Sequence, residues 1–490
     1  MLNKLIALCI AAALTTSLSS AAQQTLPELG DVTRGDLSPR AEQSLGKAMI
    51  GAISKDPDYL DDNSTTTYLN GLVTRLLANH PERRGELQYP FEVFLVRDKS
   101  LNAFALPGGY IGIHTGLVAA TETESELAAV LAHEISHVSQ RHIARMLMAQ
   151  KQDVYIPFVT MGLALLTSRT NTEVSKALVF SGQGVALQRQ INFSQEAERE
   201  ADRMGHQLLV DADFDPRGMS SFFEKLEKST TLYSDAKPVF LKSHPLTSER
   251  LAEANTRTES LRYSQKISSL DYLLFKAKTR VSTATTFSEL TQLQQSFERA
   301  LSSLYPPKKA SAQFGLSLLF REQSRYVKSR EFLSSKPQDL PDVDFKQNLF
   351  FTEAQVDTEL RAKALSRAVA LAEEYARRVP PSESSALLYA STMLKANLPE
   401  KVTVYLGGMN TLPQPSLRIQ KIRAEAYSSQ DKPTLQHLAM ADYYELQQQY
   451  GLALDELARA TISKDVPSIE GEVIVAKRHS LQILLDDSKP

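Results

Sequence analysis

The chain has 490 residues, and its 55 lysines and arginines nearly balance its 57 aspartates and glutamates, for a formal net charge of −2. Hydrophobic residues make up 42% of the chain and charged residues 23%, as in ordinary globular proteins, and the length suits two or three domains. The balanced charge argues against the basic surface that proteins use to bind nucleic acid, so no nucleic-acid partner is expected.

Residues 1–22 have the pattern of a secretory signal peptide. Lys4 is the only charged residue there, an apolar run covers residues 5–14, and small residues precede the expected cleavage after Ala22. An uncleaved N-terminal anchor is the alternative, but the apolar run is short for a membrane span. The pattern therefore predicts a secreted protein.

Cysteine use agrees with secretion. Cys9 is the only cysteine of the chain, and it lies inside the predicted signal peptide. It follows Leu8, whereas a lipoprotein site has a small residue there, so we expect no lipid anchor. A mature chain without thiols suits an oxidising compartment. We therefore expect a periplasmic protein, either in solution or peripheral to the outer membrane.

The part of the chain after the signal peptide mixes strand and helix patterns. Residues 23–43 predict an N-terminal arm, whose polar stretch over residues 24–39 is expected as a loop or an extended chain, and residues 44–260 predict one domain. Alternation of apolar and polar residues predicts a strand over Phe91–Asp98. Residues 102–118 predict two strands around a Pro-Gly-Gly turn, and Glu124–Met148 predicts a helix. A small sheet packed on helices follows from this order.

Residues 153–187 are the most apolar part of the predicted mature chain. The stretch VYIPFVTMGLALL contains Pro157 and is short for a membrane span, and glycines interrupt the stretch ALVFSGQGVAL. We interpret the segment as a buried helical hairpin. A mobile cover over a functional site and a loop that contacts a membrane are the alternatives.

Residues 268–490 consist of successive helical patterns with few strand signals. Large and small residues recur in the manner of tetratricopeptide repeats. The clearest set is Met440, Ala441, Tyr444, Tyr450, Ala453, Leu457 and Ala460. A weaker copy covers residues 385–406, and an irregular helical bundle is the alternative. Repeats of this type stack into concave surfaces that bind other proteins.

The stretch LAAVLAHEISHVSQRH, residues 127–142, contains an HExxH motif. His133 and His137 are four residues apart and share one face of the predicted helix, so both imidazoles can bind one Zn²⁺. Glu134 can take a proton from water at the open metal position. Structural helices rarely bury two histidines and a glutamate on the side that faces the core. The motif therefore predicts a zinc-dependent hydrolase, with Glu134 as its catalytic base.

Such a centre needs a third protein ligand. The pattern of three histidines on one helix would place the third at position 143, which is Ile143, and His142 misses that position by one residue. We therefore reject that pattern and look for a glutamate on a second helix.

The stretch SQEAEREADRMGHQLL, residues 194–209, predicts that second helix. We choose Glu198 as the third ligand, with Glu200 as the rival position. Asp202 lies one turn after Glu198 and can accept the free N–H of a liganding histidine. Ala201 and Gly205 are small, so this helix can approach the helix of the HExxH motif closely. An exposed acidic helix start is the alternative to a ligand helix.

The motifs HEISH and EREAD, with NAFALPGG upstream and SHPLTSER downstream, resemble the zinc metallopeptidase family of the CAAX prenyl proteases and the heat-shock membrane protease. The signal peptide and the repeats narrow the resemblance to periplasmic members. The resemblance implies a mainly α protein. Its first domain would be a zincin-like α+β metallopeptidase domain with one Zn²⁺ per chain, followed by an all-α tetratricopeptide-type solenoid.

The resemblance also implies a role. The protein would be an endopeptidase with chaperone-like activity in the assembly and quality control of outer-membrane β-barrel proteins. Unfolded or misassembled outer-membrane proteins would be its clients, and the outer-membrane β-barrel assembly machinery would bind the repeats. The stretch GGYIGIH, residues 108–114, is a candidate edge strand that pairs with substrate backbone. The rival hypothesis is a chaperone or scaffold without catalysis, whose zinc site is structural.

Two further residues are candidates for the site. His244 precedes Pro245 and is expected on a loop. It can act as a fourth zinc ligand that restrains the protease, as a residue that orders the segment of Arg250, or as a donor to the oxyanion. Arg250 itself is either an oxyanion donor or a structural residue.

Overall fold

The computed structural model describes residues 38–84, 91–149, 195–232, 239–259, 266–335, 345–408, 416–463 and 468–487, together with residues 340 and 465. The predicted signal peptide and the apolar segment 153–187 lie outside these residues. In the described part of the chain, no helix is long and apolar enough to cross a membrane.

The first described helix begins inside the segment predicted as an arm. Helix α2 covers Pro39–Ile53, and the side chain of Ser38 caps its N-terminus by accepting a hydrogen bond from the backbone N–H of Ala41. Proline is favoured in the first turn of a helix because it lacks the N–H that would be unpaired there. The prediction of an N-terminal arm up to residue 43 is therefore wrong for its last five residues.

Four strands form one mixed sheet in the order β1-β2-β4-β3. Strand β2 pairs antiparallel with β1 and parallel with β4, and β3 pairs antiparallel with β4. The strands are β1 Tyr59–Leu60, β2 Glu92–Val96, β3 Ala103–Ala105 and β4 Tyr110–His114. The predicted strand over residues 91–98 and the two strands around the Pro-Gly-Gly turn are thus confirmed. Gly108 in that turn has a φ of 77°, which L-residues rarely adopt.

The prediction that residues 108–114 form an exposed edge strand is wrong. Strand β4 has a hydrogen-bonded neighbour on each side, and all five of its residues are buried. Strand β2 pairs in parallel with the side of β4 that was expected to be free. Strand β3, on the other side of β4, is an edge strand.

The side chains of the sheet alternate between two cores, as the pleat requires. On one face, Val93 and Ile111 pack with helices α3 (Asn63–Leu76) and α5 (Glu124–Ser139). On the other face, Phe94 and Tyr110 pack with α2 and α6 (His142–Ala149). The sheet is therefore the middle layer of this part of the protein.

The helix predicted over residues 124–148 is divided in two. Arg141 lies between α5 and α6 and has a φ of 51°, in the left-handed region. A residue in this conformation ends an α-helix and turns the chain. The direction of His142 therefore differs from the one it would have on a continuous helix.

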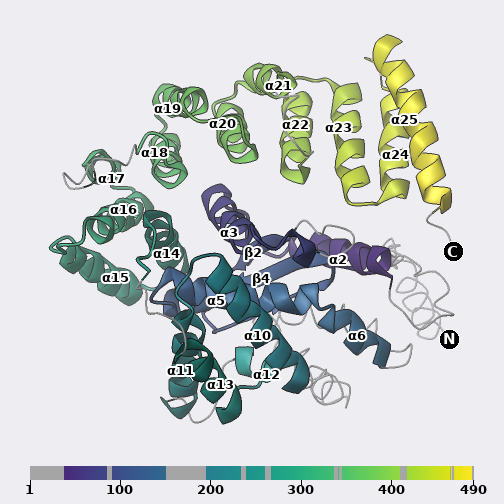
Figure 1. The fold of residues 1–490 in the computed structure, drawn as a ribbon. Helices are drawn as coiled ribbons and strands as arrows, with labels where there is room; N and C mark the ends of the chain where they lie inside the picture. The colour runs from purple at the N-terminus through teal and green to yellow at the C-terminus, as the bar shows by residue number, and fades with distance from the viewer. Residues whose placement is uncertain are drawn as a thin grey trace, which may run out of the picture.

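The part of the chain before residue 260 has three more short elements before residue 121 and four more helices after residue 194 among its described residues. Figure 1 shows α10, α11, α12 and α13 on the side of α5 opposite to α3. The elements are η1 Pro81–Arg84, η2 Pro107–Gly109, α4 Thr115–Ala120, α10 Gln195–Asp211, α11 Arg217–Leu232, α12 Val239–Ser243 and α13 Ser248–Glu259.

From residue 270 onward every described element is a helix. Successive helices pack on one another along the chain and form an arc that passes over α3 and α2 (Figure 1). They are α14 Leu270–Thr283, α15 Phe287–Ala300, α16 Pro306–Glu322, α17 Tyr326–Ser334, α18 Leu349–Arg361, α19 Leu365–Arg378, α20 Glu383–Lys395, α21 Pro399–Gly407, α22 Leu417–Ser429, α23 Pro433–Leu446, α24 Tyr450–Thr461 and α25 Ser468–Asp487.

The hydrophobic core does not stop at the predicted domain boundary. A single buried cluster includes Leu127 of α5 and continues through Tyr272 of α14 and Phe314 of α16 to Phe350 of α18. The helices from α19 to α22 have a second cluster, and α23 to α25 have a third. The first helices of the arc therefore share a core with the domain that carries the HExxH motif.

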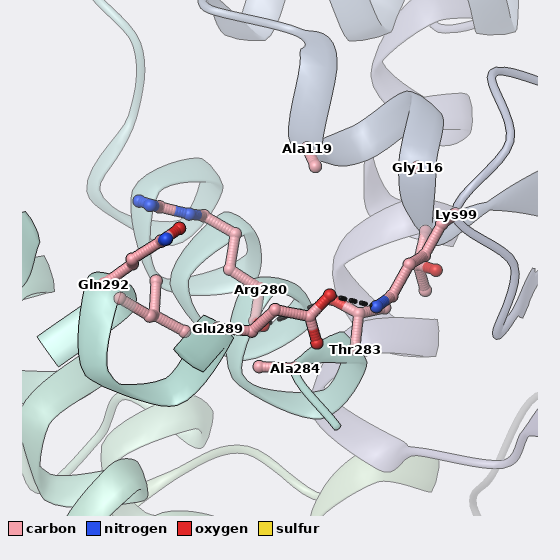
Figure 2. A pocket seen from close by; sticks show the side chains of 10 residues that line it. Lys99, Gly116, Ala119, Arg280, Thr283, Ala284, Glu289 and Gln292 are labelled. Atoms are coloured by element: carbon pink, nitrogen blue, oxygen red, sulfur yellow. Dashed lines mark hydrogen bonds and ion pairs between the residues drawn. The ribbon is translucent and has the colours of Figure 1, made fainter. Parts of the chain in front are cut away.

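A hollow of about 330 Å³ lies at this junction, between α4 and the helices α14 and α15. Figure 2 shows Lys99 on one side and Glu289 on the other, joined by an ion pair. Glu289 also completes the capping box at the start of α15. The hollow contains none of the predicted site residues, so it is not the candidate active site.

A partly buried ion-pair network also crosses the junction, and we predict that it stabilises the fold. The ammonium of Lys278 on α14 lies 2.6 Å from Asp62, the N-cap of α3, and 2.8 Å from Glu353 on α18. Burial opposes a charged Lys278, but the two carboxylates raise its pKa. Lys278→Met should lower the free energy of unfolding by about 2–3 kcal/mol, because it leaves two carboxylates close together without a cation.

Urea unfolding followed by circular dichroism measures this effect. The control is Lys401→Met. The side chain of Lys401 is 46% exposed in its pair with Glu373, so this substitution should have a much smaller effect on the free energy of unfolding. Equal effects of the two substitutions would contradict the prediction.

Candidate metal centre

Helix α5 carries the HExxH motif into the interior of the protein. The side chain of Thr123 caps its N-terminus by accepting a hydrogen bond from the backbone N–H of Glu126. The helix is buried on nearly all sides, and His133, Glu134 and His137 are at most 3% exposed. A helix with this environment holds its side chains in fixed positions.

Helix α10 packs directly against α5, as the small residues of its sequence predict. A Cβ atom built on Gly205 would lie 3.0 Å from the backbone nitrogen of His133, and Ala201 is fully buried. A larger side chain at position 205 would push α10 away from α5. The close approach brings Glu198 and Asp202 to the histidines.

Four side chains converge on one point: the ligand atoms of His133, His137, Glu198 and His244 all lie within 4.8 Å of one another. The Nε2 atoms of His133 and His137 are 3.0 Å apart. The carboxylate of Glu198 lies 3.5 Å from His133, 3.4 Å from His137 and 2.9 Å from His244. The predicted ligands on α5 and α10 are thus neighbours, and His244 joins them.

The electrostatics of this cluster keep Glu198 ionised. Burial opposes ionisation, but His244, His133 and His137 lower the pKa of Glu198 well below its usual range. Burial lowers the pKa of His137 well below 6.5, so its imidazole is neutral at neutral pH. An ionised carboxylate and a neutral imidazole are the forms in which these residues bind metals.

The arrangement fits a zinc ion. The Nε2 atoms of His133 and His137 are close enough for one ion to contact both. Imidazole nitrogens and a carboxylate oxygen are ligands that Zn²⁺ prefers. Both oxygens of Glu134 are buried without a hydrogen-bond partner among the described residues. Glu134 is therefore next to the cluster without belonging to it, as a general base should be.

Asp202 and Arg250 contact the cluster from outside it. Asp202 Oδ1 lies 3.0 Å from His133 Nδ1, the ring nitrogen that faces away from the other ligands. Burial opposes ionisation of Asp202, but Arg250 and His133 lower its pKa. Arg250 donates two hydrogen bonds to Asp202 and a third to the carbonyl of Pro245, and its NH1 lies 2.8 Å from Glu198. This geometry favours the structural role of Arg250 over the role of an oxyanion donor.

His244 lies in the short connection between α12 and α13. Its backbone N–H donates to the carbonyl of Phe240, and its ring stacks on that of Phe240 with the centroids 4.6 Å apart. The side chain is 3% exposed, and its Nε2 lies 3.5 Å from Glu134. Its position in the cluster agrees with the fourth-ligand hypothesis.

The sequence did not predict the role of one residue that lies next to the cluster. His142, which we rejected as a third ligand, has its Nδ1 2.9 Å from His137 Nδ1 and its Nε2 3.1 Å from Glu200. Glu200 therefore lies outside the cluster of four, on the far side of His142. The sequence contained only a weak signal for this contact, a histidine five residues after His137.

Comparison with known proteins now identifies the family. Residues 63–258 match peptidase family M48. A Vibrio cholerae protein named putative β-barrel assembly-enhancing protease is 30% identical over 343 residues, which cover 70% of this chain and 69% of that protein. The chain belongs to peptidase family M48. As an M48 peptidase with the HExxH motif, it is a zinc metalloendopeptidase.

Two other relatives of this M48 peptidase match smaller parts of it. The β-barrel assembly-enhancing protease of Escherichia coli K12 is 32% identical over 309 residues, or 63% of this chain and 62% of the E. coli protein. The mitochondrial metalloendopeptidase OMA1 of Arabidopsis thaliana is 34% identical over 179 residues, or 35% of this chain and 33% of the plant protein.

Proposed function

We propose that this M48 peptidase acts in the periplasm on outer-membrane β-barrel proteins and degrades chains that are unfolded or misassembled. The observation that carries the proposal is the buried cluster of His133, His137 and Glu198 beside Glu134, whose buried carboxylate accepts no hydrogen bond among the described residues. The names of the relatives in Vibrio and Escherichia support the client class. The signal-peptide pattern of residues 1–22 supports the compartment.

Each residue of the site has its own role in the proposed hydrolysis of a peptide bond. Zinc held by His133, His137 and Glu198 would supply a Lewis acid that polarises the peptide carbonyl and lowers the pKa of water toward neutrality. Glu134 takes the proton of the attacking water and gives it to the leaving amine. Asp202 fixes the orientation of His133 and in turn is held by Arg250.

The substrate backbone would pair with strand β3. This strand ends the sheet and is hydrogen-bonded on one side only, to β4, among the described strands, and it packs next to α5. Strand addition requires a client with free backbone groups, as in an unfolded or half-assembled chain.

The helical arc would hold clients or their assembly machinery, and we propose that it is built of tetratricopeptide-type repeats. Lys363, Asn397 and Asp431 lie in turns between helices, have φ values of 54–58°, and follow one another at intervals of 34 residues. This interval is the length of a tetratricopeptide repeat. Ala453 and Ala460, two of the predicted small positions, are fully buried. Chaperone-like activity would come from this surface.

Cleavage of a β-barrel outer-membrane protein, offered unfolded or folded in detergent, tests the proposed function. The full chain should cut the unfolded form much faster. A chelator should abolish cleavage, and added zinc should restore it. Casein serves as an unfolded protein of another class. Equal cleavage of the folded barrel, or cleavage that survives the chelator, would refute the proposal.

The position of His244 suggests a zinc site in which protein ligands occupy all four positions. Structural zinc sites have four protein ligands, whereas catalytic sites leave one position open. With His244, the cluster has four ligand residues. In this metalloendopeptidase, the arrangement fits a centre that His244 holds inactive until a client displaces it.

We predict that His244→Ala raises proteolysis several-fold, including self-cleavage. The physical reason is that a fourth protein ligand excludes water from the centre. The measurement is the rate of casein cleavage at saturating zinc, with zinc content determined in parallel. The control is His206→Ala, a histidine on α10 outside the cluster. Lost activity at full zinc content would indicate an oxyanion donor, and unchanged activity would leave a purely structural role.

A further inference from the structure

The two histidines of α5 each have one ring nitrogen in the cluster and one that points away from it. His133 Nδ1 lies against Asp202, an arrangement common around metal ligands. His137 Nδ1 lies 2.9 Å from Nδ1 of His142. A second imidazole thus stands where an acidic residue supports the first histidine.

The hydrogen-bond directions around His142 follow from its contacts. A histidine that binds metal through Nε2 carries its proton on Nδ1, so His137 donates and His142 Nδ1 accepts. The proton of His142 is then on Nε2, which lies 3.1 Å from Glu200 Oε2 and donates to it. Arg145 also donates to this oxygen, at 3.0 Å. The chain of contacts therefore ends in an ion pair.

The local backbone makes this contact possible. Arg141, with its φ of 51°, turns the chain between α5 and α6 and directs His142 back toward His137. The guanidinium of Arg141 is 3.1 Å from Glu42 on α2, whose side chain is 2% exposed. The corner is thus held to α2 on one side and, through Glu200, to α10 on the other.

The two liganding histidines therefore have matched supports. For His133 the support is Asp202, held by Arg250. For His137 it is His142, followed by Glu200 and its cation. Both supports include a carboxylate of α10, the helix that also carries Glu198.

We propose that His142 is a positioning residue for His137: it accepts the Nδ1 proton of His137, selects the tautomer that binds zinc through Nε2, and connects this ligand to Glu200. The proposal rests on the zinc site described above. It adds a residue outside the HExxH motif and the Glu198 helix to the groups that determine zinc affinity.

The test compares His142→Ala with His142→Asn in the full chain. The amide oxygen of asparagine can occupy the place of Nδ1 and accept from His137, whereas alanine offers no acceptor. Zinc affinity is measured by competition with a chromophoric chelator, and the geometry of the site by the visible absorption of the cobalt-substituted protein. Circular dichroism and the melting temperature report folding. The control is again His206→Ala, since His206 is a buried histidine of α10 outside the cluster.

His142→Ala should weaken zinc binding by about 10- to 100-fold and change the cobalt spectrum. His142→Asn should restore most of the affinity, and His206→Ala should match the wild type. Wild-type affinity and spectrum in His142→Ala, or equal losses in the alanine and asparagine variants, would overturn the proposal. A wrong assignment of the zinc site itself would give a different result: His133→Ala would bind zinc as tightly as the wild type does.

Discussion

Glu134→Gln should abolish peptide hydrolysis and leave zinc in place. Glutamine keeps the size of the side chain but cannot take a proton from water, and general-base catalysis contributes about 10²- to 10⁴-fold to a rate. Glu134 is fully buried, lies beside the cluster of ligands and is not one of them. Zinc content should therefore stay at one ion per chain.

Two parallel measurements check this result: metal analysis of the purified protein and the rate of casein cleavage. Glu196→Gln, a change at an exposed residue of α10, provides the matched control and should retain full activity. Full function of Glu134→Gln with bound zinc would favour the scaffold hypothesis, because a structural site needs no base.

Loss of a zinc ligand should strongly weaken zinc binding. Glu198→Ala should weaken zinc binding by more than about 100-fold, beyond what the loss of an outer partner causes, since the only carboxylate of the cluster would be gone. His133→Ala and His137→Ala should behave in the same way. The chelator competition described above measures the affinities.

Glu200→Ala is the matched comparison for Glu198→Ala. Both residues are glutamates of α10, but Glu200 contacts His142 and Arg145 instead of the cluster. Its loss should cost less affinity than the loss of Glu198. If Glu200→Ala released zinc while Glu198→Ala kept it, the assignment of the third ligand would be wrong.

The core of the candidate site could be predicted from the sequence because helical spacing determines it locally. Histidines at positions 133 and 137 share a helix face wherever that helix lies. Glycine at position 205 indicated that a second helix approaches closely. A Cβ atom added there would lie only 3.0 Å from the backbone nitrogen of His133, which confirms the close approach. Glu198 and Asp202, four residues apart, then had to face the same side.

The features that the sequence did not reveal depend on contacts between distant segments or on one unusual backbone angle. The edge of the sheet was assigned to residues 108–114, because the parallel pairing of β2 with β4 has no local signal. His142 was rejected on the assumption of a continuous helix, and nothing in the residue type of Arg141 indicates a positive φ. The stacking of His244 on Phe240 is likewise a tertiary contact.

The continuous core has a consequence for building chimaeras between relatives. Helix α18 belongs to two hydrophobic clusters, since Phe351 packs toward the peptidase domain and Val356 packs toward α20. An exchange of helical arrays at residues 260–268 would cut through the interior of the enzyme and expose Tyr272 and Phe275, which are fully buried. A crossover after Arg361 instead keeps the cluster of the peptidase domain whole and interrupts the next cluster where Val356 meets α19 and α20. Under the function proposed for the arc, client preference is then exchanged from α19 onward, with the enzyme and its first five arc helices kept as one piece.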